Sequence, residues 1–213
     1  QGASLTAWVG TASAEQTAAL GISAGSTVTM PKGLLRIGRH RVVARSFDDR
    51  SGSTALLLAL GRIDPAKIRK KVTVAWSVQE EVGLVGAEAL ARDLPGLTGV
   101  YPVDTFVSSD SPVETQRFAY APLGKGLVLR TMDNAYLAPR ALIDRYAGLA
   151  AQKGIPFQYG FTGGASDGVA FLRHGVTMLP FSWPGRYSHS PVEVADLRDV
   201  EALVRMVTAV IQE

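Results

Sequence analysis

The stretch KVTVAWSVQEEVGLVGAEALARDL, residues 71–94, joins the two patterns that decide the fold class. From Val72 to Val78 every second residue is apolar, which is the period of a strand, and residues 85–94 are interpreted as the helix that follows. Between these segments stand Glu80 and Glu81. Because like charges repel and a buried charge is costly unless it is paired or bound to a metal, a core strand that ends on two adjacent carboxylates needs an explanation.

The same succession of strand and helix recurs along most of the chain. Further strands are predicted at residues 41–47, 105–109, 126–132 and 176–183, and further helices at 53–63, 136–154 and 197–211. Strands that alternate with helices indicate an α/β fold, which we expect to be a mixed, mostly parallel sheet covered by helices.

The last predicted helix has the clearest helical signals. Asp196 is its expected N-cap, and an apolar stripe runs along one face. The stripe consists of Leu197, Val200, Val204, Val207 and Ile211.

The first 45 residues differ from the rest, since they consist of short, glycine-rich segments that favour strands. Strands are predicted at 5–10 and 26–30, and a short helix at 13–21, where Ser13 and Gln16 have the spacing of a capping box. We therefore assign residues 1–45 to part of a small β-rich domain and residues 46–213 to a larger one.

The composition excludes several classes of protein. The absence of cysteine rules out disulfides, thiol catalysis and cysteine metal ligands, and it fits a reducing compartment, which we expect to be the cytoplasm. The 22 basic and 19 acidic residues give a net charge of +3 without a basic stripe, so no nucleic-acid partner is expected. No apolar run approaches the roughly 20 residues that cross a bilayer, so no membrane partner is expected either.

The beginning of the chain is also informative. Residues 1–10 lack the basic segment and long apolar core of a signal peptide, and the first residue is not methionine. We expect the numbering to start inside a longer or processed polypeptide.

Charged residues collect where the predicted strands end. They are Asp48, Asp49 and Arg50 after the strand 41–47, Glu80 and Glu81 after 72–78, Asp110 after 105–109, and Arg186 and His189 after 176–183. Each alone could be a helix cap or a favourable first-turn charge. Because ligands of open α/β sheets bind beyond the carboxyl ends of the strands, we expect these residues to converge on one edge.

Converging carboxylates repel one another unless a cation lies among them. A donor set of Asp, Glu and one His without Cys suits zinc, cobalt or manganese. Of two adjacent glutamates, one can bind the metal while its neighbour takes a proton from metal-bound water. This division of labour gives the Glu80–Glu81 pair a chemical reason.

Four motifs resemble those of a known family in the same order. They are FDDRSG (47–52), VQEEVGLVGA (78–87), GGASDG (163–168) and RYSHSPVEV (186–194). In these motifs the chain resembles the dinuclear-metal aminopeptidases, which include glutamyl and deblocking aminopeptidases and some members described as cellulase-like. Many of them assemble into tetrahedral dodecamers. The resemblance runs from about residue 5 to the C-terminus.

The resemblance implies a role for each metal-site residue. Asp48 would bridge two divalent metal ions, zinc or cobalt, and would be joined to Asp49 by a cis peptide bond. Glu81 and His189 would complete the ligands of one ion, and Asp110 would bind the other. Glu80 would be the general base.

The resemblance also implies the substrate pocket and the partners. Arg186 and the loop residues Gly164, Ser166 and Asp167 would shape the pocket for peptides. Residues 1–45 would be the distal part of an inserted β domain that makes oligomer contacts, so homo-oligomers from a dimer to a dodecamer are expected. The preferred N-terminal residue stays open.

One expected ligand is missing from the chain. The family has a further histidine ligand in a His-x-Asp motif upstream of the inserted domain, whereas this chain contains only His40, His174 and His189 and no such motif. Two hypotheses follow: an aminopeptidase whose own N-terminal segment supplies the histidine, or a non-catalytic metal-binding or assembly protein. A hydrolase for another amide, such as an N-acyl amino acid, is a third.

Overall fold

The computed structural model describes residues 6–31, 33–114 and 118–213. It divides the chain into two compact units, Gln1–Gly33 and Leu34–Glu213, and each is described by itself. Among the described residues, no helix is both long and apolar enough to cross a membrane.

The smaller unit contains the short helix α1 (Ala14–Ala19). Ser13 caps it by accepting a hydrogen bond from the Gln16 backbone N–H, as the capping-box spacing predicted. The strands predicted at 5–10 and 26–30 are wrong, since residues 6–31 contain no strand; Leu5 lies outside the described residues. A strand needs a paired neighbour, and here Val28 and Met30 stay exposed without one.

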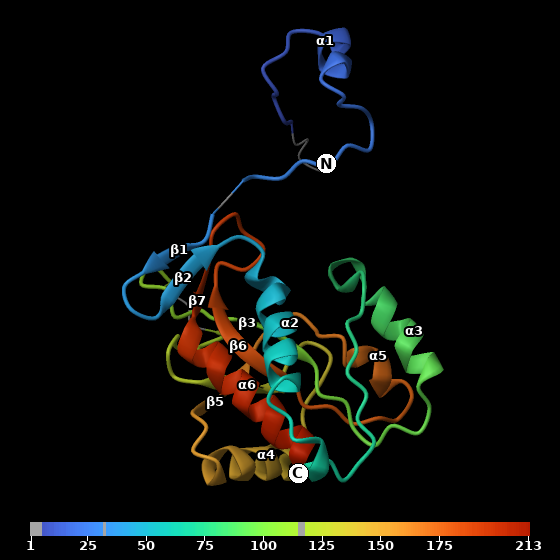
Figure 1. Cartoon of the computed structure of the whole chain (residues 1–213), viewed down its shortest axis with the longest axis vertical. Helices are drawn as coiled ribbons and strands as arrows, with labels where there is room; N and C mark the ends of the chain where they lie inside the picture. Colours follow the sequence, from blue (N-terminus) through green and yellow to red (C-terminus); the bar gives the residue numbers. More distant parts are fainter. Residues whose placement is uncertain (1–5, 32, 115–117) are drawn as a thin grey trace. The chain divides into compact units, whose positions relative to one another are not determined.

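The larger unit is built on a sheet of seven strands within its described residues. In chain order they are β1 (Leu35–Ile37), β2 (Arg41–Ala44), β3 (Val103–Val107), β4 (Leu127–Met132), β5 (Phe157–Phe161), β6 (Phe181–Arg186) and β7 (Glu193–Asp196). Their order in the sheet is β1-β2-β7-β6-β4-β5, and β3 pairs with β6. The mixed α/β fold is therefore confirmed (Figure 1).

The balance of strand directions differs from the expectation of a mostly parallel sheet. The pairs β3–β6 and β4–β5 are parallel, whereas β1–β2, β2–β7, β4–β6 and β6–β7 are antiparallel. Short connections return the chain antiparallel between β1 and β2 and between β6 and β7. Apolar alternation reveals a strand but not its direction.

The hairpin β1–β2 belongs to the larger unit. Val42 and Val43 of β2 pair with Ala195 and Val194 of β7, and both valines are buried. The whole hairpin lies within residues 1–45, which were expected to form part of the small domain. Its pairing with β7 anchors the strand that leads to Asp48.

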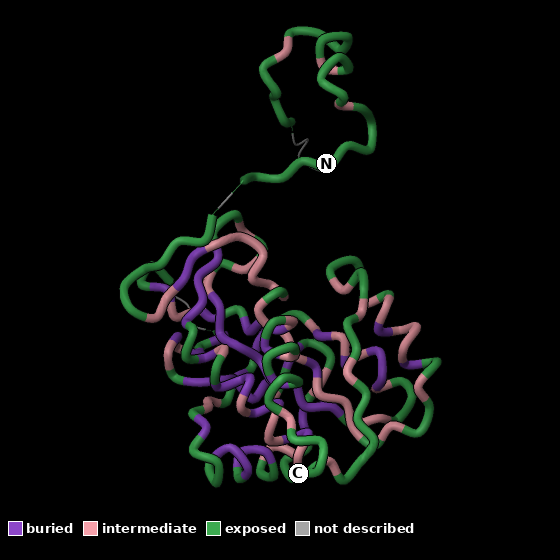
Figure 2. Tube along the Cα trace, in the orientation of Figure 1, coloured by how far each residue is buried: buried purple, intermediate pink, exposed green. Residues whose placement is uncertain are grey.

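Helices α2 (Phe47–Leu60), α4 (Arg140–Gln152) and α6 (Leu197–Gln212) share one apolar core with the sheet. Figure 1 shows α2 and α6 side by side. The largest fully buried side chains of this core include Trp183, Tyr146, Phe181, Leu203 and Met206. Figure 2 shows the same distribution, with buried residues concentrated in the sheet and in α6.

A smaller cluster joins α3 (Val85–Asp93) to α5 (Val169–Leu172). The short 3₁₀ turns η1 (Pro65–Lys67) and η2 (Glu80–Val82) lie before α3 in the chain. The turn η2 carries the two adjacent glutamates, so it links this cluster to the site.

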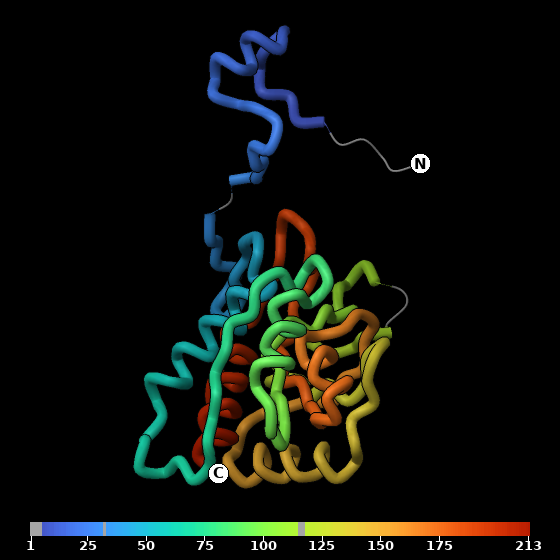
Figure 3. The backbone as a smooth tube through the Cα atoms, turned by 90° about the vertical axis from the view of Figure 1, so that its right-hand side faces the viewer, coloured from blue at the N-terminus to red at the C-terminus, as the bar shows by residue number. Residues whose placement is uncertain are grey.

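The segment 71–78, predicted as a core strand, is extended but belongs to no strand. Trp76 and Val78 are 46% and 68% exposed, and the backbone groups of 72–77 form no hydrogen bond with another backbone group of the described residues. Figure 3 shows the segment as one long teal-green run across the larger unit. The prediction was wrong because the segment has the apolar alternation of a strand but pairs with no other strand of the described residues.

Candidate metal centre and active site

Asp48 is positioned by the backbone at the start of α2. Ser46 adopts a left-handed conformation with φ 57°, and the Asp48–Asp49 peptide bond is cis, as expected. The buried carboxylate of Glu193, on β7, accepts hydrogen bonds from the backbone N–H groups of Phe47 and Asp48, the latter at 3.1 Å. The neighbouring strand thus holds the backbone that carries Asp48.

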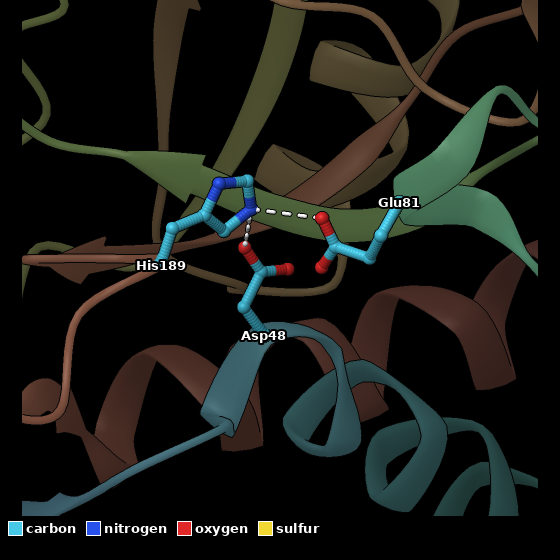
Figure 4. Close-up of side chains that lie close together, drawn as sticks. All are labelled: Asp48, Glu81 and His189. Carbon is cyan, nitrogen blue, oxygen red and sulfur yellow. Dashed lines mark ion pairs between the residues drawn. The ribbon is translucent and has the colours of Figure 1, made fainter. Parts of the chain in front are cut away.

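Asp48, Glu81 and His189 come from three distant parts of the chain and meet at one point (Figure 4). The Nε2 atom of His189 lies 3.2 Å from Oδ2 of Asp48 and 3.1 Å from Oε2 of Glu81. The three ligand atoms all lie within 4.8 Å of one another, which is the spacing of atoms around one metal ion. These are the three residues that the resemblance implied as ligands of one metal ion.

A second group consists of Asp48, Asp49 and Asp104, whose carboxylate oxygens also lie within 4.8 Å of one another. Oδ1 of Asp49 accepts a hydrogen bond from Trp183 Nε1 at 2.8 Å and another from the Gly52 N–H at 3.1 Å. Asp49 is therefore held by protein donors. Asp48 belongs to both groups, which is the arrangement expected of a bridging ligand.

The crowding of carboxylates affects their protonation. Burial, with the nearby charge of Asp48 as a smaller cause, raises the pKa of Asp49 to about 7. Burial and then the charges of Asp49 and Asp48 raise the pKa of Asp104 well above its ordinary value. Carboxylates placed this close together favour a proton or a cation between them.

Glu80 and Glu81 occupy successive positions of η2, which Gln79 enters with a left-handed φ of 58°. Because successive residues of a 3₁₀ helix are about 120° apart, the two side chains point in different directions. Burial, and then the charges of Glu81, Asp167 and Asp48, raise the pKa of Glu80 to about 7. Glu80 is in neither of the two groups.

The structure does not bring Asp110 into either group. Arg186 donates to its carboxylate from Nε at 2.6 Å and from Nη2 at 2.8 Å, and the Leu123 N–H donates at 3.0 Å. Asp110 is thus engaged with donors of this chain, and the guanidinium of Arg186 is engaged in turn. Asp104, which the sequence analysis missed, is the carboxylate that lies beside Asp48.

A signal for Asp104 was present in the sequence. It is an acidic residue inside an apolar strand, where an unpaired charge is costly. Only residues that follow a strand were expected to reach the site, whereas Asp104 lies inside β3, which spans Val103–Val107.

The loop 163–168 approaches the site through Asp167. Ser77 donates a hydrogen bond to Asp167, and Asp167 is close enough to Glu80 to affect its pKa. Gly164 is exposed with a φ of 83°, whereas Ser166 is fully buried. Gly164 is thus open to solvent, whereas the Oδ1 atom of Asp167 is buried and Ser166 supports the loop from inside.

The loop that carries His189 also contacts the site. Tyr187 and His189 have left-handed φ values of 62° and 61°. Ser188 donates a hydrogen bond to Asp48, and the hydroxyls of Ser111 and Tyr187 lie 2.9 Å apart. These contacts and the Arg186–Asp110 ion pair position His189.

Known peptidases resemble this chain in sequence. The profile of the family described as M42 glutamyl aminopeptidase matches residues 4–206. The lysyl aminopeptidase of Pyrococcus furiosus is 28% identical over 209 residues, which cover 96% of this chain and 58% of that protein. The chain therefore spans little more than half the length of this relative.

Two solved structures extend the comparison to the fold. The aminopeptidase APDkam598 of the archaeon Desulfurococcus kamchatkensis has a TM-score of 0.88 at 31% identity, covering 96% of this chain and 58% of that one. The TET1 peptidase of Pyrococcus horikoshii, which can assemble into a tetrahedron or a large octahedral shell, has a TM-score of 0.75 at 35% identity, covering 84% and 52%. On its sequence profile, the chain belongs to the M42 glutamyl aminopeptidase family.

Proposed function

We propose that this chain carries the metal site of a metal-dependent aminopeptidase that removes N-terminal residues from peptides. The observation that carries the proposal is the convergence of Asp48, Glu81 and His189 on one point, with Glu80 adjacent to Glu81. Membership of the M42 family supports it, as does the peptidase or aminopeptidase description of the relatives.

The residues present fit divalent metal ions, since carboxylate oxygen and imidazole nitrogen are donors that zinc and cobalt accept. Asp48, Glu81 and His189 would hold one ion, and Asp48 and Asp104 would contribute to the second. When bound, the ions would supply Lewis-acid activation of water and of the scissile carbonyl. In this proposal Asp104 takes the place that the sequence analysis gave to Asp110.

Glu80 acts as the general base. Its carboxylate is close enough to Asp48, Glu81 and Asp104 for their charges to interact, and it belongs to neither group. It can therefore accept a proton from the attacking water and return it to the leaving amine. Asp167 and Gly164 line the approach of the peptide. Arg186 supports the His189 loop through Asp110.

A polypeptide segment outside residues 1–213 completes the fold and the second metal site in this proposal. Residues 72–77 of the extended segment 71–78 form no hydrogen bond with another backbone group of the described residues, and Trp76 and Val78 are exposed, so a neighbouring strand would cover them. The greater length of the relatives is consistent with such a segment. It would also carry the histidine that this chain lacks. The tetrahedral relatives favour a homo-oligomer.

The substitution Glu80→Gln tests the mechanism because it removes the base without changing its size. Hydrolysis of aminoacyl substrates should fall by about 10²- to 10⁴-fold while bound zinc or cobalt stays the same. Glu88→Gln on α3, which removes the same charge from a residue paired with Arg173, should leave both unchanged. Full activity of the Glu80→Gln variant would remove Glu80 from the mechanism.

The alternative functions give different results in the same assay. A non-catalytic metal-binding or assembly protein would bind no more than one ion per chain and turn over no substrate. The exposure of Glu81 and His189, whose side chains are 54% and 67% exposed, is the observation that favours this alternative. Turnover of N-acyl amino acids without turnover of peptides would indicate the third hypothesis.

A further inference from the structure

Arg130 is a buried cation that neither the sequence analysis nor the proposed mechanism uses. It lies on β4, and its side chain is only 3% exposed. The register of β4 against β5 shifts just after this residue, between Arg130 and Met132. Such an irregularity bends a strand and changes the direction of neighbouring side chains, so the regular pairing of β4 is interrupted next to Arg130.

The guanidinium of Arg130 contacts three groups. Nη1 donates to Oδ2 of Asp104 at 3.5 Å, Nη2 donates to the Gly163 carbonyl at 3.4 Å, and Nε lies 3.2 Å from Oδ2 of Asp133. These contacts come from β3, from the start of the loop 163–168 and from the turn after β4. One rigid, planar cation thus joins three separate segments.

Both carboxylate oxygens of Asp104 accept a hydrogen bond from the protein. Its Oδ2 faces Arg130, and its Oδ1 accepts a hydrogen bond from the Thr105 N–H at 2.7 Å. The same carboxylate lies in the group with Asp48 and Asp49. Arg130 and the Thr105 N–H are thus two donors that this carboxylate accepts from.

The contact with Gly163 connects Arg130 to the loop beside Glu80. The backbone N–H of Asn134 donates to the Gly164 carbonyl at 3.1 Å, so the turn that contains Asp133 holds the loop as well. Asp167, farther along this loop, accepts the hydrogen bond from Ser77. The position of the loop and the orientation of Asp104 thus share one support.

Stability alone does not explain a buried Arg at this position. A buried ion pair loses most of its Coulombic gain to desolvation, and apolar replacements of such pairs are often neutral. The interactions that Arg130 makes are instead those of a group that orients a metal ligand, and loss of such support typically costs about 10–100-fold in metal affinity.

We propose that Arg130 is a positioning residue that orients Asp104 for the second metal ion and fixes the loop 163–168 beside it. This inference rests on the proposed function, because it requires that Asp48 and Asp104 bind an ion.

Titration of the metal-free protein, in its natural full-length form, with Co²⁺ tests the inference. The wild-type protein should show two binding events, and Glu81→Gln identifies the event that belongs to the Asp48–Glu81–His189 group. Arg130→Met should weaken the other event by about 10–100-fold and leave this one within a factor of three. Arg130→Lys, which keeps the charge, should restore part of the loss.

The controls separate positioning from folding. Arg140→Met removes the same charge from an exposed pair with Asp144 and should change neither event. Thermal unfolding of each variant shows whether the fold is intact. An equal loss of Co²⁺ affinity at both sites in Arg130→Met would indicate a merely structural role and would overturn the inference. If Arg130→Met bound both Co²⁺ ions with unchanged affinity, the inference about Arg130 would be overturned while the proposed function would stand. A single event in the wild-type protein would overturn both the inference and the two-ion site.

Discussion

The carboxylate of Glu193 shows how single residues build this site. It is buried on β7 and accepts the backbone N–H groups of both Phe47 and Asp48. An ionised carboxylate offers acceptors only, so it suits two donors that point at one place. Without it, these two N–H groups at the start of α2 would need another partner.

Replacement of Glu193 by Gln should therefore affect both stability and metal binding. Both N–H groups donate to the same oxygen, Oε2, so an amide oxygen in that place keeps both hydrogen bonds but loses their charge assistance, which should cost about 1–2 kcal/mol of unfolding free energy. Because Asp48 belongs to both candidate metal groups, both Co²⁺ binding events should weaken. Urea unfolding and Co²⁺ titration measure the two effects.

The exposed residue Glu201 provides the matched control. It pairs with Arg62 at the surface, and Glu201→Gln should change stability by no more than about 1 kcal/mol. If Glu193→Gln bound Co²⁺ as tightly as the wild-type protein, Glu193 would not support Asp48.

Site residues that follow a strand can be predicted from the sequence more readily than site residues within a strand. Asp48, Glu81 and His189 each come after a segment that was predicted as a strand, and the three side chains do converge. Asp104 lies inside β3, and Arg130 inside β4, where an apolar pattern hides them. Their importance comes from contacts between strands that are distant in sequence, which no local pattern contains.

Among the elements, α6 was predicted best because its signals are local. The predicted helix 197–211 is found at Leu197–Gln212, and the Asp196 side chain accepts the Arg198 N–H as an N-cap. Along the predicted stripe, Val204, Val207 and Ile211 are buried, whereas Leu197 is 40% exposed. The segment 71–78 failed for the opposite reason, since a strand depends on a neighbour that its own residues cannot specify.

The first turn of α6 also makes a pH-sensitive contact with the loop before β4. Asp199 is fully buried and accepts the N–H groups of Gly124 and Gly126 at 2.6 and 2.7 Å. Burial outweighs these hydrogen bonds and raises the pKa of Asp199 to about 7.

The sign of the resulting pH dependence follows from the raised pKa. Between the ordinary pKa of an aspartate and about 7, the folded state holds a proton that the unfolded state has lost, so the contribution of Asp199 to stability falls as pH rises. The slope is at most about 1.4 kcal/mol per pH unit. Asp199→Asn should remove this decline, so the stability of the variant relative to wild type should improve from pH 5 to pH 7.

Urea unfolding of both proteins across this pH range measures the effect. Asp144→Asn on the exposed face of α4 is the control and should follow the wild-type curve. Parallel curves for Asp199→Asn and wild type would show that Asp199 has the same pKa in both states.

For the whole molecule, the most informative feature is the exposed segment 71–78 of the larger unit. This unit has a well-packed core around Trp183 and Phe181, yet the segment 71–78 beside it exposes Trp76 and Val78. The fold class and the order of the main elements were predictable, since both follow from alternating patterns. The lack of a partner strand for 71–78 among the described residues was not predictable, because pairing depends on residues distant in sequence.

Hydrogen exchange tests whether another strand covers this segment. The amides of 72–77 should exchange within seconds in the 213-residue chain and at least about 100-fold more slowly in the protein isolated from its own cells. The mass of that protein should also exceed 22.6 kDa. The amides of β3 are the internal reference, since β3 pairs with β6 in either case. Equally fast exchange at 72–77 in both proteins would contradict the proposed strand.

The left-handed residues of the larger unit carry a consequence for its evolution. Among the residues that the structure describes, all non-glycine residues with positive φ flank or belong to the two metal groups: Ser46, Gln79, Leu84, Tyr187 and His189. Each such backbone costs about 1–2 kcal/mol, which glycine would relieve. Laboratory selection for heat resistance alone should therefore accumulate glycines around the site, and such variants would gain thermal tolerance while losing the rigid geometry that catalysis requires.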